Sequence, residues 1–241
     1  MAKHERSYYF ISVSKGEVTR QMILERALSL ASELGLEGVT IGHLASDLSL
    51  SKSGLFSHFQ SKEALQLQVL DFAALRFVEI VIRPAMACPA GEKRIRAMFE
   101  SWLEWPKPEA LPGGCFFVAA ASELDDRFGP LRDRLVELQV RWLSVLAESA
   151  RQAVAEGEFR PEIDGEQFAH DVYGIMLAFH HAARLLRDPK AKARARTAFE
   201  SLLTAARRQP LAEPVEGEFA SSPGNRGPGL SFLTPERTGV S

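Results

Sequence analysis

Apolar residues recur at helical spacing along most of this chain, and alternating strand-type patterns are scarce. The first helical face consists of apolar residues three and four positions apart, namely Ile23, Ala27, Leu30, Ala31 and Leu34. We expect Thr19 to cap the start of this helix and Gly35 to end it in a left-handed conformation. The sequence therefore predicts an all-α protein.

Two shorter helices are predicted after the first. One follows Thr40, and the other spans 52–59 behind Ser51, whose hydroxyl can cap it. A long fourth helix starts at Lys62 and is expected to end near residue 82, because Pro84 follows. Further helices are predicted over 91–105, 115–126, 130–156, 164–187 and 189–207.

The pattern divides the chain into four parts. Residues 1–16 are interpreted as a flexible leader, 17–62 as a three-helix domain and 63–208 as a larger helical domain. The last 33 residues contain five prolines and five glycines. This predicts a disordered tail over 209–241, because such a segment buries too little apolar surface to offset the entropy of ordering.

Composition limits the possible functions. Apolar residues make up 46% of the 241 residues, and the formal net charge of −2 provides no overall basic field. Lys and Arg outnumber Asp and Glu by only seven to six over residues 1–62, so DNA binding would need a local positive surface. The two cysteines, Cys88 and Cys115, favour a reducing, cytoplasmic location. We expect no membrane span, since no apolar stretch approaches ~18 residues.

The three short helices match a helix-turn-helix unit, which places its last helix in the major groove of DNA. At about 100° per residue, Leu55 and Phe59 face the other helices. The opposite face carries the small, hydrogen-bonding side chains of Ser53 and Ser57 and the aromatic ring of Phe56, with Gly54 beside them. A glycine in a helix often allows close approach of another molecule. An ordinary solvated helix has the same composition, so both interpretations stay open at this point.

The same region resembles the TetR family of bacterial regulators. The resemblance is carried by TRQMILERA (19–27), GLEGVTI (35–41), LA (44–45), LSKSGLFSHF (50–59) and SKEAL (61–65). It covers about 48 residues almost continuously, and it favours DNA binding over the solvated-helix interpretation.

The resemblance implies roles for particular residues. Thr40 would cap the second helix and touch phosphate, the third helix would read the major groove, and Lys62 would contact the DNA backbone. The DNA-binding residues expected on this basis are Thr40, Lys52, Ser53, Gly54, Phe56, Ser57, His58 and Lys62. The expected protein is a ligand-responsive repressor that binds double-stranded DNA at a near-palindromic operator as a homodimer. An activator remains an alternative.

Two positions depart from the family pattern. Family members usually carry tyrosine where this chain has Phe56, and loss of that hydroxyl removes about 0.5–1.5 kcal/mol of hydrogen bonding to a phosphate. The turn before the third helix often carries glycine where this chain has Ser49. If that turn needs a positive φ, Ser49 is slightly strained. A related alternative is a body that binds effector while the head no longer reads DNA.

The larger domain is rich in aromatic residues, which indicates either a pocket for a small apolar or aromatic effector or a packed helical core. The residues expected to line an effector pocket are Phe99, Trp102, Phe117, Trp142, Tyr173 and His180. His180 and His181 diverge by about 100° on a helix and cannot chelate one metal ion. No nucleophile–base pair or glycine-rich phosphate loop appears, so we expect no enzymatic activity, no metal and no cofactor.

The last two predicted helices favour a dimer interface. Residues 164–187 carry apolar side chains on two faces, and a helix with two apolar faces must bury both. Residues 189–207 carry alanines that allow close helix packing, and the resemblance implies that these two helices form the homodimer. A two-fold dimer would place two recognition helices about 34 Å apart, in successive major grooves.

Overall fold

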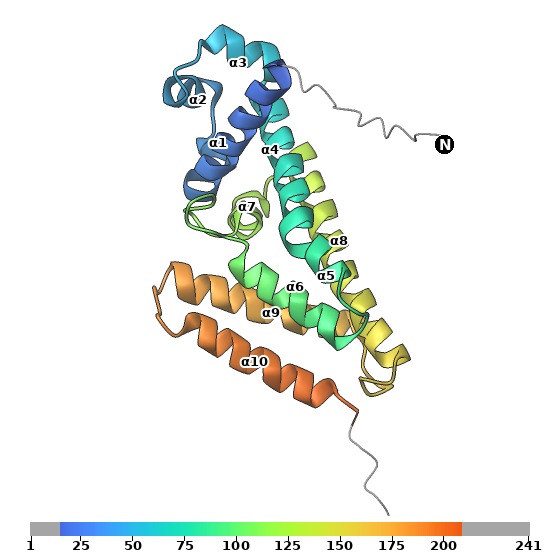
Figure 1. Ribbon diagram of the computed structural model, residues 1–241. Coiled ribbons are helices and arrows are strands. Elements are labelled where there is room, and N and C mark those ends of the chain that lie inside the picture. The colour runs from blue at the N-terminus through green and yellow to red at the C-terminus, as the bar shows by residue number, and fades with distance from the viewer. Residues whose placement is uncertain (1–14, 209–241) are drawn as a thin grey trace, which may run out of the picture. The chain divides into compact units, whose positions relative to one another are not determined.

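The computed structural model describes residues 15–208, and within this range every regular element is a helix (Figure 1). The elements are α1 (Lys15–Gly38), α2 (Ile41–Asp47), α3 (Lys52–Phe59), α4 (Lys62–Phe77), η1 (Val78–Ile82), α5 (Arg83–Met86), α6 (Glu92–Glu104), α7 (Phe116–Leu124), α8 (Pro130–Ala155), α9 (Gly165–Arg184) and α10 (Ala191–Ala206). The predicted all-α class is confirmed. The predicted tail and most of the predicted leader lie outside the described residues.

The first helix differs from its prediction at both ends. α1 begins at Lys15, so the expectation that Thr19 caps it is wrong, and Gly16 is helical rather than part of a leader. Glu17 lies in the first turn, where a negative charge favours a helix start. Gly35 has the expected positive φ, 74°, but its ψ of 169° is extended rather than left-handed helical. A helical turn therefore resumes over residues 36–38 after a break.

Three side-chain hydroxyls begin the next three helices. The Thr40 hydroxyl accepts a hydrogen bond from the His43 amide at 3.1 Å, at the start of α2. Ser51 and Ser61 do the same for α3 and α4, each over 3.0 Å. Because each hydroxyl satisfies a backbone N–H that has no partner within its helix, these short helices have defined starting points.

The fourth helix does not end near residue 82, as its prediction required. The Arg83 amide donates to the carbonyl of Val78, five residues back, which is the π-helical pattern of η1. Pro84 then lies in the first turn of α5, and the helix runs on to Met86. Pro84 has no N–H to donate, and it follows directly after the residue whose amide completes the π-helical turn.

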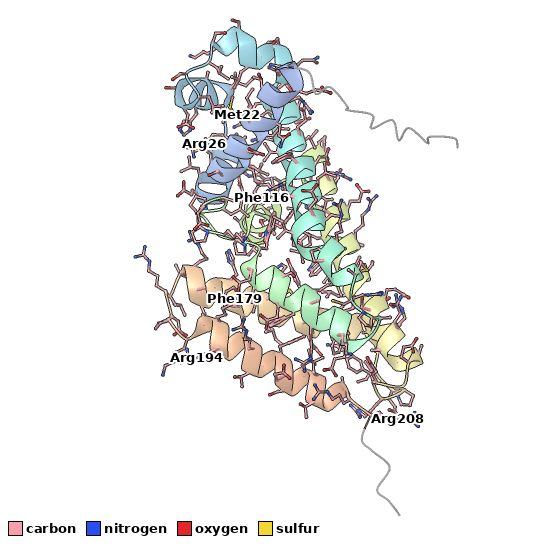
Figure 2. All side chains as sticks on the ribbon, viewed as in Figure 1. Met22, Arg26, Phe116, Phe179, Arg194 and Arg208 are labelled. Carbon is pink, nitrogen blue, oxygen red and sulfur yellow. The ribbon has the colours of Figure 1, made fainter. Side chains whose placement is uncertain are left out.

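Buried apolar side chains form one core from Ile23 in α1 to Ala206 in α10. In Figure 1, α1–α3 gather at one end of α4, and α8 runs beside α4. α7 packs against α1, and α9 packs between α8 and α10. Figure 2 shows Phe116 in the interior beside α4, where it is fully buried, whereas Arg194 extends outward from α10. None of the helices in residues 15–208 is long and apolar enough to span a membrane.

Candidate functional site

The third helix presents two unlike faces. Leu55 and Phe59 are buried on the side where α3 packs against α2 and α4, and we define α1–α3 as the head. The opposite face is exposed and consists of Lys52, Ser53, Gly54, Phe56 and Ser57, with His58 half-buried at its edge. The Phe56 ring is 55% exposed, although it is a large apolar group. The residues expected to enter a major groove therefore lie together on one surface.

The two serines of this face are partly engaged within α3. The Ser57 hydroxyl donates to the Gly54 carbonyl at 2.7 Å, and the Ser53 hydroxyl lies 3.3 Å from the Ser51 hydroxyl. Each hydroxyl oxygen keeps acceptor capacity, so both can still receive hydrogen bonds from base amino groups. A Cβ at Gly54 would meet only the Ser51 hydroxyl, at 3.0 Å, which leaves the outer side of this glycine open.

Two non-glycine residues with positive φ flank α3. Ser49 has a φ of 53°, so the turn does need the conformation that glycine adopts more easily. Gln60 has a φ of 62° at the other end of the helix. The sequence located a break at Gln60, but no residue type there signalled a positive φ.

Thr40 and Lys62 lie at the starts of α2 and α4. Thr40 uses its hydroxyl oxygen as an acceptor for α2, so its hydrogen remains available to a phosphate oxygen. The Lys62 ammonium donates to a Glu37 carboxylate oxygen at 2.7 Å, and this bond lowers the pKa of Glu37. The Lys62 side chain is still 40% exposed, so a phosphate can compete with Glu37 for it.

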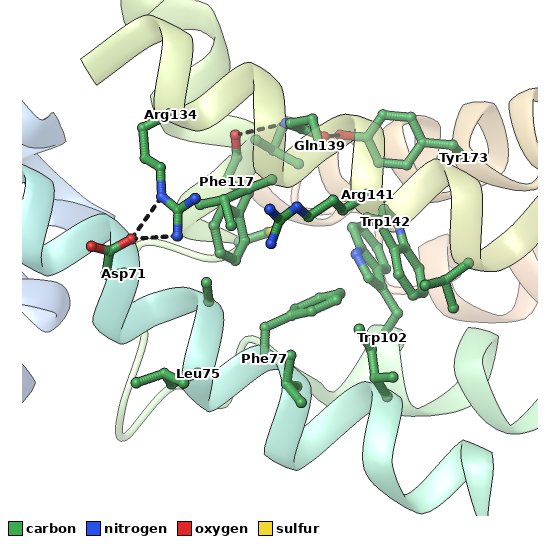
Figure 3. A pocket seen from close by; sticks show the side chains of 17 residues that line it. Asp71, Leu75, Phe77, Trp102, Phe117, Arg134, Gln139, Arg141, Trp142 and Tyr173 are labelled. Carbon is green, nitrogen blue, oxygen red and sulfur yellow. Dashed lines mark hydrogen bonds and ion pairs between the residues drawn. The ribbon is translucent and has the colours of Figure 1, made fainter. Parts of the chain in front are cut away.

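The larger helices form a cavity of about 370 Å³ that is partly open to solvent (Figure 3). α4 and η1 form one wall and α8 the opposite wall, with further residues from α6, α7 and α9. The lining residues are Asp71, Ala74, Leu75, Phe77, Val78, Ile82, Trp102, Cys115, Phe117, Val118, Arg134, Leu138, Gln139, Arg141, Trp142, Val145 and Tyr173. The lining is predominantly apolar and aromatic, as in sites for small organic molecules.

Four of the six residues expected to line a pocket do so, namely Trp102, Phe117, Trp142 and Tyr173. Phe99 lies elsewhere: its ring is fully buried and stacks on Phe199 of α10, with 3.9 Å between ring centroids. His180 is also outside the cavity, near Gly114 of the loop before α7. Burial, with Arg184 and His181 nearby, lowers the pKa of His180.

The sequence predicted no residue of the α4 wall, and only Trp142 from α8. Phe77 is the centre of the α4 wall, with edge-on ring contacts to Trp105, Phe117 and Trp142 at centroid distances of 5.0–5.6 Å. The signal was present, because α4 carries apolar residues on more than one face and ends in an aromatic ring. None of its residues is among the six expected from the sequence to line the pocket.

A few polar groups interrupt the apolar lining. The Tyr173 hydroxyl donates to Gln139 Oε1 at 2.8 Å, and burial raises the pKa of Tyr173 to about 12. Arg134 of α8 donates to Asp71 of α4 at 2.7 Å, which joins the two walls (Figure 3). Burial raises the pKa of the Cys115 thiol to about 11, so this cysteine is a neutral packing group at neutral pH. No cluster of three potential metal ligands occurs among residues 15–208.

Comparisons with known proteins match both parts of the molecule. The model of bacterial regulatory proteins of the tetR family matches residues 23–69, and that of the tetracyclin repressor-like C-terminal domain matches residues 91–199. The HTH-type transcriptional repressor KstR2 of Mycobacterium tuberculosis is 27% identical over 151 residues, which cover 60% of this chain and 71% of that protein.

Solved structures share the fold. A TetR transcriptional regulator from Chloroflexus aurantiacus superposes with a TM-score of 0.70 at 27% identity, over 79% of this chain and 94% of that chain. AibR, in complex with isovaleryl coenzyme A and operator DNA, superposes with a TM-score of 0.58 at 22% identity, over 73% and 96% of the two chains. The likeness to AibR is one of fold alone.

The head, the helical body and these matches define a helix-turn-helix transcriptional regulator. Proteins of this class act by binding DNA and not by catalysis. The chain belongs to the TetR family of bacterial regulators.

Proposed function

We propose that this chain is a homodimeric repressor in the bacterial cytoplasm, which binds a near-palindromic operator through α3 and leaves it when a small apolar molecule fills the cavity. The observation that carries this proposal is that one helix, α4, borders both the DNA-reading surface and the cavity. α4 starts at Lys62 beside the reading face and lines the cavity from Asp71 onward. A ligand in the cavity therefore touches the same helix that supports the head.

For the operator contacts, we assign base reading to the exposed face of α3 and phosphate contacts to the starts of α2, α3 and α4. Ser53, Ser57 and the open side of Gly54 would approach base edges, with Phe56 and His58 beside them. Thr40, Lys52 and Lys62 would contact phosphates, because their donors lie at helix starts where N–H groups and positive side chains favour anions. Such contacts position the protein, while the α3 face provides sequence preference.

For the dimer, we assign the interface to the outer faces of α9 and α10. α9 exposes Gly174, Ala178 and 38% of Leu177, and Leu185 beyond its end is 71% exposed. α10 exposes Ala198, Ser201, Thr204 and Ala205 on its outer side, whereas Ala191, Ala195 and Ala206 pack inward. Small residues beside exposed leucines allow two copies of this helix pair to approach closely, with a two-fold axis between them.

For the effector, the cavity favours an elongated, mainly apolar molecule. Its α4 wall runs from Asp71 to Ile82, which corresponds to roughly 16 Å at the rise of a helix. A volume of about 370 Å³ over that length leaves room for the thickness of one chain or one flat ring system. Polar atoms of the effector would form hydrogen bonds with the Gln139–Tyr173 pair or the Arg134–Asp71 pair.

The proposal is tested by selecting operator sequences from a random double-stranded library with the full chain. We expect a near-palindrome, bound by two chains per duplex in analytical ultracentrifugation. Lys52→Ala should weaken binding to all sequences. It should also reduce the slope of log K against log salt concentration by about one, as expected for the loss of one phosphate contact, whereas Ser57→Ala should change the selected sequence. Selection of no sequence over random DNA at low salt would refute the repressor and favour a ligand-binding protein whose head no longer reads DNA.

A further inference from the structure

A carboxylate from the body caps the break in the first head helix. The break at Gly35 leaves the amides of the turn over residues 36–38 without helical partners. Glu123, near the end of α7, accepts hydrogen bonds from the Leu36 and Glu37 amides at 2.7 Å each. A Cβ at Gly35 would lie 2.6 Å from Glu123 Oε2, so the residue at 35 must be small as well as able to adopt a positive φ.

The capped turn also positions a DNA contact. The Gln66 side chain, which is buried in α4, donates to the Leu36 carbonyl at 2.7 Å, on the opposite side of the turn from Glu123. Glu37, in the same turn, holds the Lys62 ammonium at 2.7 Å and lies 3.6 Å from Arg127. Any movement of the turn therefore moves the Glu37 carboxylate that binds Lys62, one of the proposed phosphate contacts.

The helix that carries Glu123 lines the cavity with its other end. Phe117 and Val118 of α7 are cavity residues, and Cys115 directly before the helix is a third. The preceding loop is pressed onto α1, because the Gly113 amide donates to the Ser32 hydroxyl at 3.0 Å. α7 has only nine residues, so a displacement at Phe117 is transmitted to Glu123 over less than two helical turns.

We propose that Glu123 is a positioning residue that couples the cavity to the DNA-reading head. A molecule that fills the cavity displaces α7, which weakens the two bonds from Glu123 to the turn over 36–38 and lets this turn move, so that Lys62 and the helix starts of the head lose the spacing that fits an operator. This inference rests on the proposed function in one respect, namely that the cavity is the effector site. Coupling of this kind needs an element with two arrangements that both sites bias, and we assign that role to the capped turn.

The coupling is first tested without DNA, by hydrogen exchange on the full chain. Val118→Phe places extra volume in the cavity from α7 itself and stands in for the unidentified ligand. We expect exchange at the Leu36 and Glu37 amides to accelerate by about tenfold, since each loses a bond to a charged acceptor. The His43 amide, capped within the head by Thr40, serves as the control and should change by less than about twofold.

Equal protection of Leu36 and Glu37 in the two proteins would overturn the proposal. Circular dichroism must show native helix content for Val118→Phe, and Val118→Met is used in the same measurement if it does not. Because this experiment contains no operator, its failure is distinct from a failure of the repressor assignment.

A double-mutant cycle then measures the coupling at the operator. Glu123→Gln keeps the size of the side chain but leaves a single oxygen acceptor, and Asp126→Asn removes a charge one turn away as a matched control. Val118→Phe should weaken operator binding by about fivefold or more in the native and Asp126→Asn backgrounds, and by less than about twofold with Glu123→Gln. An equal effect of Val118→Phe in all three backgrounds, or none in any, would show that Glu123 does not couple the sites.

Discussion

Ser49→Gly should stabilise the protein, although it removes a side chain. Ser49 has a φ of 53° in the turn between α2 and α3 and is exposed. This conformation costs a residue with a Cβ about 1–2 kcal/mol. Glycine avoids that strain but adds about 0.4–1 kcal/mol of entropy to the unfolded chain. The net expectation is a gain of about 0.5–1 kcal/mol in the free energy of unfolding.

The control for this substitution is Ser46→Gly, three residues earlier. Ser46 is also exposed but lies in α2 with helical backbone angles. The same chemical change there should destabilise the protein by a few tenths of a kcal/mol, because glycine is the poorer helix former. The two variants therefore have opposite expected signs, which separates the effect of backbone conformation from the loss of a serine.

The assay is thermal and urea unfolding at one fixed protein concentration, since a dimer's stability depends on concentration. For a chain of this size a gain of about 0.5–1 kcal/mol corresponds to a rise of roughly 1–4 °C in Tm. A Tm for Ser49→Gly that falls as far as that of Ser46→Gly would refute the assignment of strain to this turn.

Three further predictions concern other parts of the molecule. Phe56→Tyr should tighten operator binding by about two- to tenfold in fluorescence anisotropy, because the exposed ring regains a donor for phosphate; unchanged affinity would argue against a backbone contact at this position. Gly113→Ala should lower the free energy of unfolding by about 3 kcal/mol in urea titrations, since a Cβ there would lie 1.6 Å from the Ser32 carbonyl oxygen. Gly42→Ala is the control, because its Cβ has room and the free energy of unfolding should not fall in this way. Hydrogen bonds from Arg207 and Arg96 lower the pKa of Glu92, so its contribution to stability is full above its ordinary value of 4.5 and is lost as the pH falls through the lowered value. Glu92→Gln should thus be less stable than the native protein at neutral pH and approach it in acid, and a difference that stays constant with pH would contradict this.

The head was largely predictable because its signals are local. Ser51 precedes an apolar helical pattern, and a hydroxyl at that position can satisfy a nearby amide without help from the rest of the fold. Leu55 and Phe59 were correctly assigned to the buried side from their spacing alone. Thr19 failed as a cap since nothing local prevents a helix from starting one turn earlier.

The cavity was only partly predictable because its shape depends on contacts between distant helices. Phe99 and Trp102 are three residues apart in α6, yet one stacks on α10 and the other faces the cavity. Composition gives no information on how a helix is rotated about its axis within a bundle. Glu123, near the end of α7, binds backbone amides some 87 positions earlier, a pairing that no local pattern contains.

The π-helical turn at η1 determines which residues of the long helix face the cavity. Phe77 and Ile82 are five residues apart, so they would diverge in a regular α-helix, but bonding to the fifth residue back brings them to the same side. The turn amounts to one residue more than a regular helix requires. Such a surplus residue sets the rotation of the helix beyond it, so its removal would turn Ile82 and the residues after it away from the cavity.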